Sequence, residues 1–196
     1  MSLRPDLAVI AGLIAPDTRV LDVGCGDGAL LAALRADKRV DGRGIELSAA
    51  NVAAAVARGL SVVQGDAGAD LADYPADAFD VAILSNTLQA MAAPAAVLAE
   101  LLRIARAAVV SFPNFGHWRV RVTLGLGGRM PVTRTLPVGW YETPNIHLCT
   151  IADFRALAAT LGMRVDAAVY LTGDRPVGAT AANLLAEQAV FVLRRG

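Results

Sequence analysis

The stretch Val20-Leu-Asp-Val-Gly-Cys-Gly-Asp-Gly28 decides the fold of this chain. Arg19–Val23 is a run of β-branched and leucine residues that ends in three closely spaced glycines, and Ala29–Ala36 then has the composition of a helix. Glycine allows the chain to turn sharply and lets the backbone approach a ligand, because no side chain intervenes. The stretch therefore predicts a strand, a ligand-binding turn and a helix in succession.

The same alternation continues along the chain. We expect further strands at Gly42–Leu47, Leu60–Gln64, Asp80–Leu84, Ala107–Phe112, Arg164–Leu171 and Gln188–Leu193, and further helices at Ala49–Arg58, Ala95–Ala105 and Thr150–Leu161. In the last of these helices, Thr150 and Asp153 fit an N-cap and its first turn. The pattern predicts an α/β, Rossmann-like fold: a mostly parallel seven-stranded sheet with an antiparallel last strand and helices on both faces.

Length and composition are consistent with one domain spanning residues 1–196. The chain is 55% hydrophobic with 5% aromatic residues, as expected for a buried parallel sheet. Its mean hydropathy is +0.49, but the longest uncharged run, between Asp80 and Glu100, is interrupted by polar residues and Pro94. We therefore expect no membrane span. The N-terminus has no signal-peptide pattern, so we expect a soluble cytoplasmic protein.

Charge is balanced overall but unevenly distributed. Residues 1–100 carry 13 acidic against 7 basic side chains, whereas residues 101–141 carry no acid and six arginines: Arg103, Arg106, Arg119, Arg121, Arg129 and Arg134. These arginines are either solvated or paired with acids elsewhere in the fold, or they form a basic face for an anionic substrate or an acidic partner. The domain as a whole is not basic, so we do not expect it to bind nucleic acid.

Residues 113–149 break the alternation of strands and helices. This segment holds four prolines, five glycines, both histidines and both tryptophans, with one short helix expected at Trp118–Leu126. A connection this long and irregular usually covers a site or forms an interface. We predict that it is a lid or a docking segment.

Two families of nucleotide cofactor use a glycine-rich turn of this kind. Gly24-x-Gly26-x-x-Ala29 satisfies the dinucleotide fingerprint, and Glu46 lies close to where its ribose-binding acid is expected. Asp22 and Asp27 favour S-adenosylmethionine instead. Asp22 can face a ligand that carries an ammonium and a sulfonium, while Asp27 would repel a pyrophosphate at the helix N-terminus.

Asp66, at the end of the third strand, is placed to accept a hydrogen bond from an adenine amino group. Glu46 and Asp66 have plainer interpretations, as a surface acid and a helix cap, but their joint position at the carboxyl edge favours binding. We predict a site for S-adenosylmethionine or S-adenosylhomocysteine. Its expected residues are Asp22, Gly24, Cys25, Gly26, Gly28, Glu46, Leu47, Asp66, Ala67 and Ser85.

Candidates for a general base are few. His117, Tyr141 and His147 lie in the irregular segment, although a histidine there more often has a structural role. Cys25 is better explained as a small residue in a tight turn than as a nucleophile. Cys25 and Cys149 have no metal-ligand spacing and no disulfide framework, so we expect no metal site.

The chain resembles the class I S-adenosylmethionine-dependent methyltransferases over nearly its whole length, and within them the MetW family of methionine-biosynthesis proteins. The strings that carry the resemblance are Gly42-Arg-Gly-Ile-Glu46, Ile83-Leu-Ser-Asn-Thr-Leu-Gln-Ala90, Val110-Ser-Phe-Pro-Asn-Phe-Gly-His-Trp-Arg119, Gly128-Arg-Met-Pro-Val-Thr133 and Trp140-Tyr-Glu-Thr-Pro-Asn-Ile-His-Leu-Cys-Thr150. Asn86 stands where the family has Gln, a change that keeps hydrogen bonding.

The resemblance implies an accessory or regulatory role beside MetX, the homoserine O-acyltransferase, with S-adenosylmethionine as the bound ligand. It implies no known methyl acceptor. The alternative is an S-adenosylmethionine-dependent methyltransferase that acts on a small molecule, because the fold alone does not decide the activity.

Overall fold

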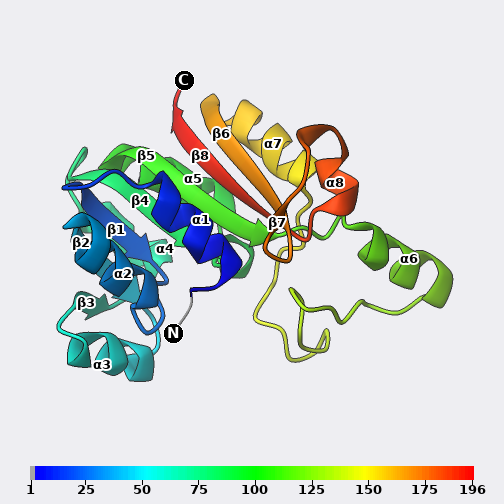
Figure 1. The fold of residues 1–196 in the computed structure, drawn as a ribbon, viewed down its shortest axis with the longest axis horizontal. Coiled ribbons are helices and arrows are strands. Elements are labelled where there is room, and N and C mark those ends of the chain that lie inside the picture. Colours follow the sequence, from blue (N-terminus) through cyan, green and yellow to red (C-terminus); the bar gives the residue numbers. More distant parts are fainter. Residues whose placement is uncertain (1–2) are drawn as a thin grey trace.

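The computed structural model describes residues 3–196 and contains one mixed sheet (Figure 1). Its strands are β1 (Arg19–Val23), β2 (Asp41–Glu46), β3 (Ser61–Gln64), β4 (Phe79–Ser85), β5 (Ala105–Pro113), β6 (Met163–Thr172), β7 (Arg175–Pro176) and β8 (Gln188–Arg195). The helices are α1 (Pro5–Leu13), α2 (Ala29–Lys38), α3 (Ala49–Ala57), α4 (Ala67–Asp70), α5 (Pro94–Ile104), α6 (Trp118–Gly127), α7 (Ile151–Thr160) and α8 (Ala182–Leu185).

The strand order is β3-β2-β1-β4-β5-β8-β6-β7. Strands β1 to β5 are parallel to one another, and β8 is antiparallel to both of its neighbours, β5 and β6. The Rossmann-like sheet with an antiparallel last strand is therefore confirmed. The sheet has eight strands rather than seven, because the two-residue β7 pairs with the end of β6. So short a strand, with Pro176 as its second residue, leaves no periodic signal in the sequence.

Each face of the sheet carries its own hydrophobic core. Along β1, Val20 joins the cluster that contains residues of α1 and α2, while Leu21 joins the cluster that contains residues of α5 and α7. This alternation is the period-two arrangement of a strand covered on both sides. Phe112 and Phe191, from β5 and β8, stack with 5.9 Å between ring centroids in the second core. Helices on both faces are thus confirmed.

Helix boundaries follow local chemistry closely. α5 begins at Pro94, which suits the first helical position, and ends at Ile104, so Ala105 belongs to β5 and not to the expected helix. α7 begins with the capping box formed by Thr150 and Asp153, as the sequence predicts. No helix within residues 3–196 is long and apolar enough to cross a membrane.

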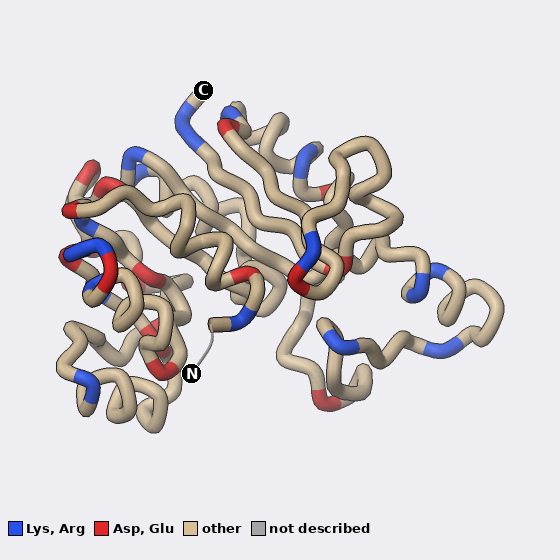
Figure 2. The backbone as a smooth tube through the Cα atoms, in the orientation of Figure 1, with Lys and Arg blue, Asp and Glu red and all other residues tan. Residues whose placement is uncertain are grey.

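The irregular segment extends away from the sheet (Figure 1). We call residues 118–148 the arm. It begins with α6, which matches the predicted short helix and buries only Val120 among its residues. In Figure 2 the arm carries several basic residues and few acidic ones. An ion pair between Arg134 of the arm and Glu187, at 2.5 Å, links the arm to the loop before β8.

Candidate functional site

The glycine turn after β1 is the centre of the candidate site. Gly24, Gly26 and Gly28 all have positive φ angles, of 72°, 57° and 77°, which side chains other than glycine rarely adopt. A Cβ on Gly24 would lie 2.6 Å from Oγ1 of Thr87, and one on Gly28 would collide with Leu60. A Cβ on Gly26 would meet no atom within 4 Å. The middle of the turn therefore faces open space, as a turn that receives a ligand requires.

Glu46, at the end of β2, holds this turn in place. Its Oε2 accepts a hydrogen bond from the Gly26 N–H at 2.8 Å, and its Oε1 accepts one from the Ser48 N–H at 2.9 Å. Glu46 is therefore not an ordinary surface acid. A carboxylate oxygen has two acceptor sites, so both oxygens of Glu46 keep capacity for a second donor.

Asp22 is a buried carboxyl group on β1, 2% exposed, and its Oδ1 has no hydrogen-bond partner among the described residues. Burial raises the pKa of this carboxyl to about 7, the Arg4 guanidinium opposes that rise, and Glu46 adds to it. A buried acceptor without a partner is costly. The arrangement suits a ligand that brings a positive charge or a hydrogen-bond donor to this point.

The remaining predicted residues have varied surroundings. Asp66 caps α4, with Oδ1 accepting from the Gly68 N–H at 2.8 Å, so the helix-cap interpretation applies while Oδ2 stays available. Leu47 is 69% exposed, whereas Ala67 is buried. Asp27 forms an ion pair with Arg58 at 2.6 Å, so part of its charge is neutralised.

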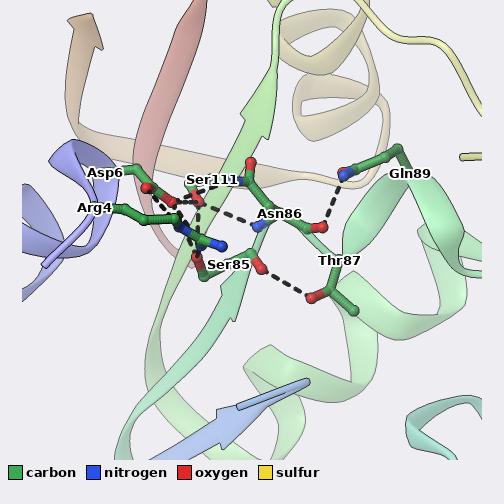
Figure 3. Close-up of polar contacts among 7 residues, drawn as sticks. All are labelled: Arg4, Asp6, Ser85, Asn86, Thr87, Gln89 and Ser111. Atoms are coloured by element: carbon green, nitrogen blue, oxygen red, sulfur yellow. Dashed lines mark hydrogen bonds and ion pairs between the residues drawn. The ribbon is translucent and has the colours of Figure 1, made fainter. Parts of the chain in front are cut away.

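Ser85 belongs to a polar cluster that the sequence did not reveal (Figure 3). Asp6, in the first turn of α1 and 1% exposed, accepts hydrogen bonds through Oδ2 from Ser85 Oγ at 3.1 Å, Ser111 Oγ at 3.2 Å and Asn86 Nδ2 at 3.1 Å. Arg4 donates to both oxygens of Asp6 at 3.2 Å. The cluster joins α1 to the carboxyl ends of β4 and β5. Pro5 at the start of a helix was the available signal for α1.

Two amide side chains beside this cluster have unpartnered oxygens. Asn86, with a φ of 50°, donates from Nδ2 to Asp6, and Gln89 donates from Nε2 to the Asn86 backbone oxygen at 2.7 Å. Their oxygens, Oδ1 and Oε1, are buried without a hydrogen-bond partner among the described residues. Together with Oδ1 of Asp22, they are three buried hydrogen-bond acceptors without a donor in residues 3–196, on β1 and on the segment that follows β4.

The three candidate bases lie in different surroundings. His117 is buried and caps α6, where its Nδ1 accepts from the Arg119 N–H at 3.3 Å. Burial lowers the pKa of His117 below its usual value. His147 is exposed and donates its backbone N–H to Gln89 at 2.9 Å, and Tyr141 is 73% exposed on the arm. No catalytic constellation follows from these positions.

The two cysteines, Cys25 and Cys149, are both free thiols. Burial is the largest cause of the raised pKa values of both thiols, to about 12 for Cys25 and about 11 for Cys149, so both stay protonated near neutral pH. A Cβ on Gly44 would lie only 2.6 Å from the Sγ of Cys25, so the Cys25 side chain packs closely against the backbone of β2, as a small residue in a tight turn can. Residues 3–196 contain no group of three potential metal ligands.

The six arginines divide into two groups. Arg103, Arg106 and Arg134 form ion pairs with Glu100, Asp80 and Glu187, respectively. Arg119, Arg121 and Arg129 have no acidic partner within the described residues: Arg119 lies over the Trp118 ring at 5.3 Å, and Arg121 donates to the Gly116 carbonyl. Pairing with acids is therefore confirmed for three of the six arginines, and the three without an acidic partner in residues 3–196 all belong to the arm. A basic face for an anionic substrate or an acidic partner stays a prediction.

Solved structures share this architecture. A TehB-like S-adenosylmethionine-dependent methyltransferase from Corynebacterium glutamicum matches with a TM-score of 0.66 and 18% identity over 100% of this chain and 89% of that one. A methyltransferase from Archaeoglobus fulgidus gives 0.71 and 14%, over 96% and 91%. The [4+2]-cyclase SpnF gives 0.69 and 17%, over 96% and 80%. The fold is that of the class I S-adenosylmethionine-dependent methyltransferases.

The family follows from the sequence comparison. The family model described as methionine biosynthesis protein MetW matches residues 4–193, so this chain belongs to the MetW family. It is 35% identical to the bifunctional methionine biosynthesis protein MetXA/MetW of Rhodopirellula baltica. That alignment covers 100% of this chain and 33% of the relative, so the chain spans about a third of that protein's length.

The Asp6 cluster predicts a large loss of stability in Asp6→Ala. The substitution leaves the buried Ser85 and Ser111 hydroxyls without their common acceptor, which we expect to lower the free energy of unfolding by about 3 kcal/mol. Urea denaturation measures this value. Asp174→Ala, at an exposed acid, is the control, and a loss below about 1 kcal/mol for Asp6→Ala would contradict the role of the cluster.

Asp22 predicts a pH-dependent stability. Its pKa is raised by folding from 3.8 to about 7, so the folded state binds the proton more tightly and loses stability as pH rises between these values. Asp22→Asn does not titrate. We expect it to gain up to roughly 4 kcal/mol relative to the wild type between pH 4 and pH 8 without ligand. A difference that stays constant across this pH range in denaturation curves would refute the prediction.

Proposed function

We propose that this chain binds S-adenosylmethionine at the carboxyl edge of its sheet and acts as an accessory or regulatory subunit of MetX, a homoserine O-acyltransferase. The observation that carries the proposal is the relative whose name joins MetXA and MetW in one polypeptide, of which this chain matches a third. We infer that the remaining length of that relative includes an acyltransferase. Two proteins fused in one relative are good candidates for a complex in another.

The cofactor part of the proposal is supported by the fit of the site. The open space above Gly26 admits a ligand close to the backbone, and the unpartnered Oδ1 of Asp22 suits a cation. S-adenosylmethionine carries both an ammonium and a sulfonium. We assign the ribose hydroxyls to Glu46 and the adenine amino group to Oδ2 of Asp66. Gly24, Cys25, Gly28, Leu47, Ala67 and Ser85 complete the expected surroundings, with the Ser85 hydroxyl already bonded to Asp6.

Binding of S-adenosylmethionine and S-adenosylhomocysteine, and not of NAD, is the first expected result. Glu46→Ala and Asp66→Ala should each weaken binding by about ten- to hundredfold, because each removes a hydrogen bond to a charged group. Isothermal titration calorimetry measures the affinities. Val56→Ala, at an exposed position on α3, serves as the control. Tighter binding of NAD than of S-adenosylmethionine would overturn the assignment.

The partner part of the proposal is supported by the arm. Of the seventeen large hydrophobic side chains exposed among residues 3–196, eleven lie on it: Trp118, Val122, Leu124, Leu126, Met130, Val132, Val138, Trp140, Tyr141, Ile146 and Leu148. Such a concentration marks an interaction surface. Aromatic residues and arginine are also enriched in interfaces, and Arg119 stacks on Trp118. We infer that the arm docks on the acyltransferase.

A complex with a homoserine O-acyltransferase is therefore expected on size exclusion. Trp118→Ala should weaken it by about 2 kcal/mol, or roughly thirtyfold, because buried tryptophans are frequent hot spots. Arg119→Glu should also weaken the complex, and more at low salt than at high salt, because the wild-type arginine attracts an acidic counterpart. Arg43→Glu, at an exposed arginine of β2 outside the arm, is the matched control.

The acylation rate of the pair distinguishes the two candidate functions. An accessory subunit should raise acyl transfer above that of the acyltransferase alone, and a sensor should make that rate respond to S-adenosylmethionine. A small-molecule methyltransferase should instead convert S-adenosylmethionine to S-adenosylhomocysteine with an acceptor. Lack of both co-elution and rate change, together with cofactor turnover, would replace the subunit proposal with the methyltransferase, which the open space above Gly26 equally allows.

A further inference from the structure

A cavity of 320 Å³ lies between the core and the base of the arm. Its apolar lining includes Leu88, Phe154 and Leu157, and the arm contributes His147 and Leu148. Small-molecule pockets begin at about 300 Å³ and combine apolar walls with a few polar groups. The cavity therefore has room for a small ligand, and its lining includes no residue of the glycine turn.

Gln89 supplies the cavity with a hydrogen-bond acceptor. Gln89 is 6% exposed and lines the cavity, and its Oε1 is buried without a partner. The orientation of its amide is fixed, because Nε2 donates to the Asn86 backbone oxygen at 2.7 Å. Exchanging the amide atoms would place two acceptors against each other. Oε1 is therefore the atom left to receive a donor, and buried oxygens of this kind normally have one.

The charge of the cavity selects the kind of donor. Asp153 is its only Asp, Glu, Lys or Arg residue, and the Asp153 carboxylate helps to raise the pKa of the neighbouring Cys149 thiol. Oδ2 of Asp153 accepts from Thr150 in the α7 capping box, and the lining contains His147 but no Lys or Arg, so the carboxylate charge favours a positively charged ligand over a carboxylate. An ammonium group offers both the positive charge and three N–H donors.

We propose that this cavity binds a small apolar molecule through a primary amino group that donates a hydrogen bond to Oε1 of Gln89. The apolar part packs against Leu88, Phe154 and Leu157. The Gln89 backbone oxygen accepts from the Ile146 and His147 N–H groups, each at 2.9 Å, so the same residue holds the base of the arm. A ligand at this site contacts the core and the arm together.

The test uses two probes with the same heavy-atom skeleton. 3-Methylbutylamine carries an ammonium group near neutral pH, whereas isovaleronitrile has a nitrogen that can only accept. Each is titrated at millimolar concentrations into ¹⁵N-labelled protein, with NMR signals of the Gln89 side-chain amide and the Leu148 backbone as the readout. We expect the amine, and not the nitrile, to shift both signals.

Variants test the role of the oxygen. Gln89→Leu should weaken amine binding at least about tenfold, because it removes a hydrogen bond to a charged group. Gln188→Leu, on β8, is the matched control and should leave amine binding unchanged. Equal binding of amine and nitrile, unchanged binding in Gln89→Leu, or no binding of the amine to the wild type would each overturn the proposal. If Gln89→Leu does not fold, the comparison of the amine with the nitrile in the wild-type protein still tests the proposal.

S-adenosylhomocysteine separates this site from the cofactor site. The titrations are repeated in its presence, and we expect the amine affinity to persist. Displacement of the amine by S-adenosylhomocysteine would assign Gln89 to the cofactor site and overturn a separate cavity. Failure of S-adenosylhomocysteine to bind at all would instead count against the proposed function, while the amine titration would still test the cavity.

Discussion

The hydrogen bond between the Gly26 N–H and the Glu46 carboxylate, at 2.8 Å, is the interaction on which the candidate site depends. It joins the turn after β1 to the end of β2, so that three glycines with positive φ angles are held in one conformation. The adjacent β1 carboxyl group, Asp22, lacks a partner for Oδ1. A rigid turn beside an unsatisfied acceptor is a preorganised site, because little ordering remains for a ligand to impose.

The sequence was sufficient for the sheet because its information is local. Every strand except the two-residue β7 coincides with an apolar run that ends near a turn, so β1 to β6 and β8 could be predicted. Asp6 could not, because Ser85, Asn86 and Ser111, which donate hydrogen bonds to its carboxylate, lie 79 to 105 positions away along the chain. Asp66 shows a third case: its position was predicted, yet only the structure reveals that one oxygen caps α4.

The composition of the arm predicted an irregular segment but not its conformation. Its prolines and glycines indicated an irregular segment, and α6 was the only element with a local signal. The sequence could not divide the arginines, because Glu187, the partner of Arg134, lies on the loop before β8. The structure leaves Arg119, Arg121 and Arg129 without acidic partners among the described residues. Of the six arginines in residues 101–141, the three without such a partner therefore lie on the segment that carries the exposed aromatic side chains.

A continuous series of hydrogen bonds links the arm to the edge of the sheet that carries the glycine turn. The His147 N–H donates to the Gln89 oxygen, Gln89 donates to the Asn86 backbone, and Asn86 donates to Asp6. Asp6 in turn holds Arg4, whose charge acts on the Asp22 carboxyl. Under the proposed function, a cation bound at Asp22 would compete with Arg4 for that carboxyl. Coupling between sites requires an element whose arrangement both sites bias, and the Arg4–Asp6 pair is the part of this series that acts on Asp22.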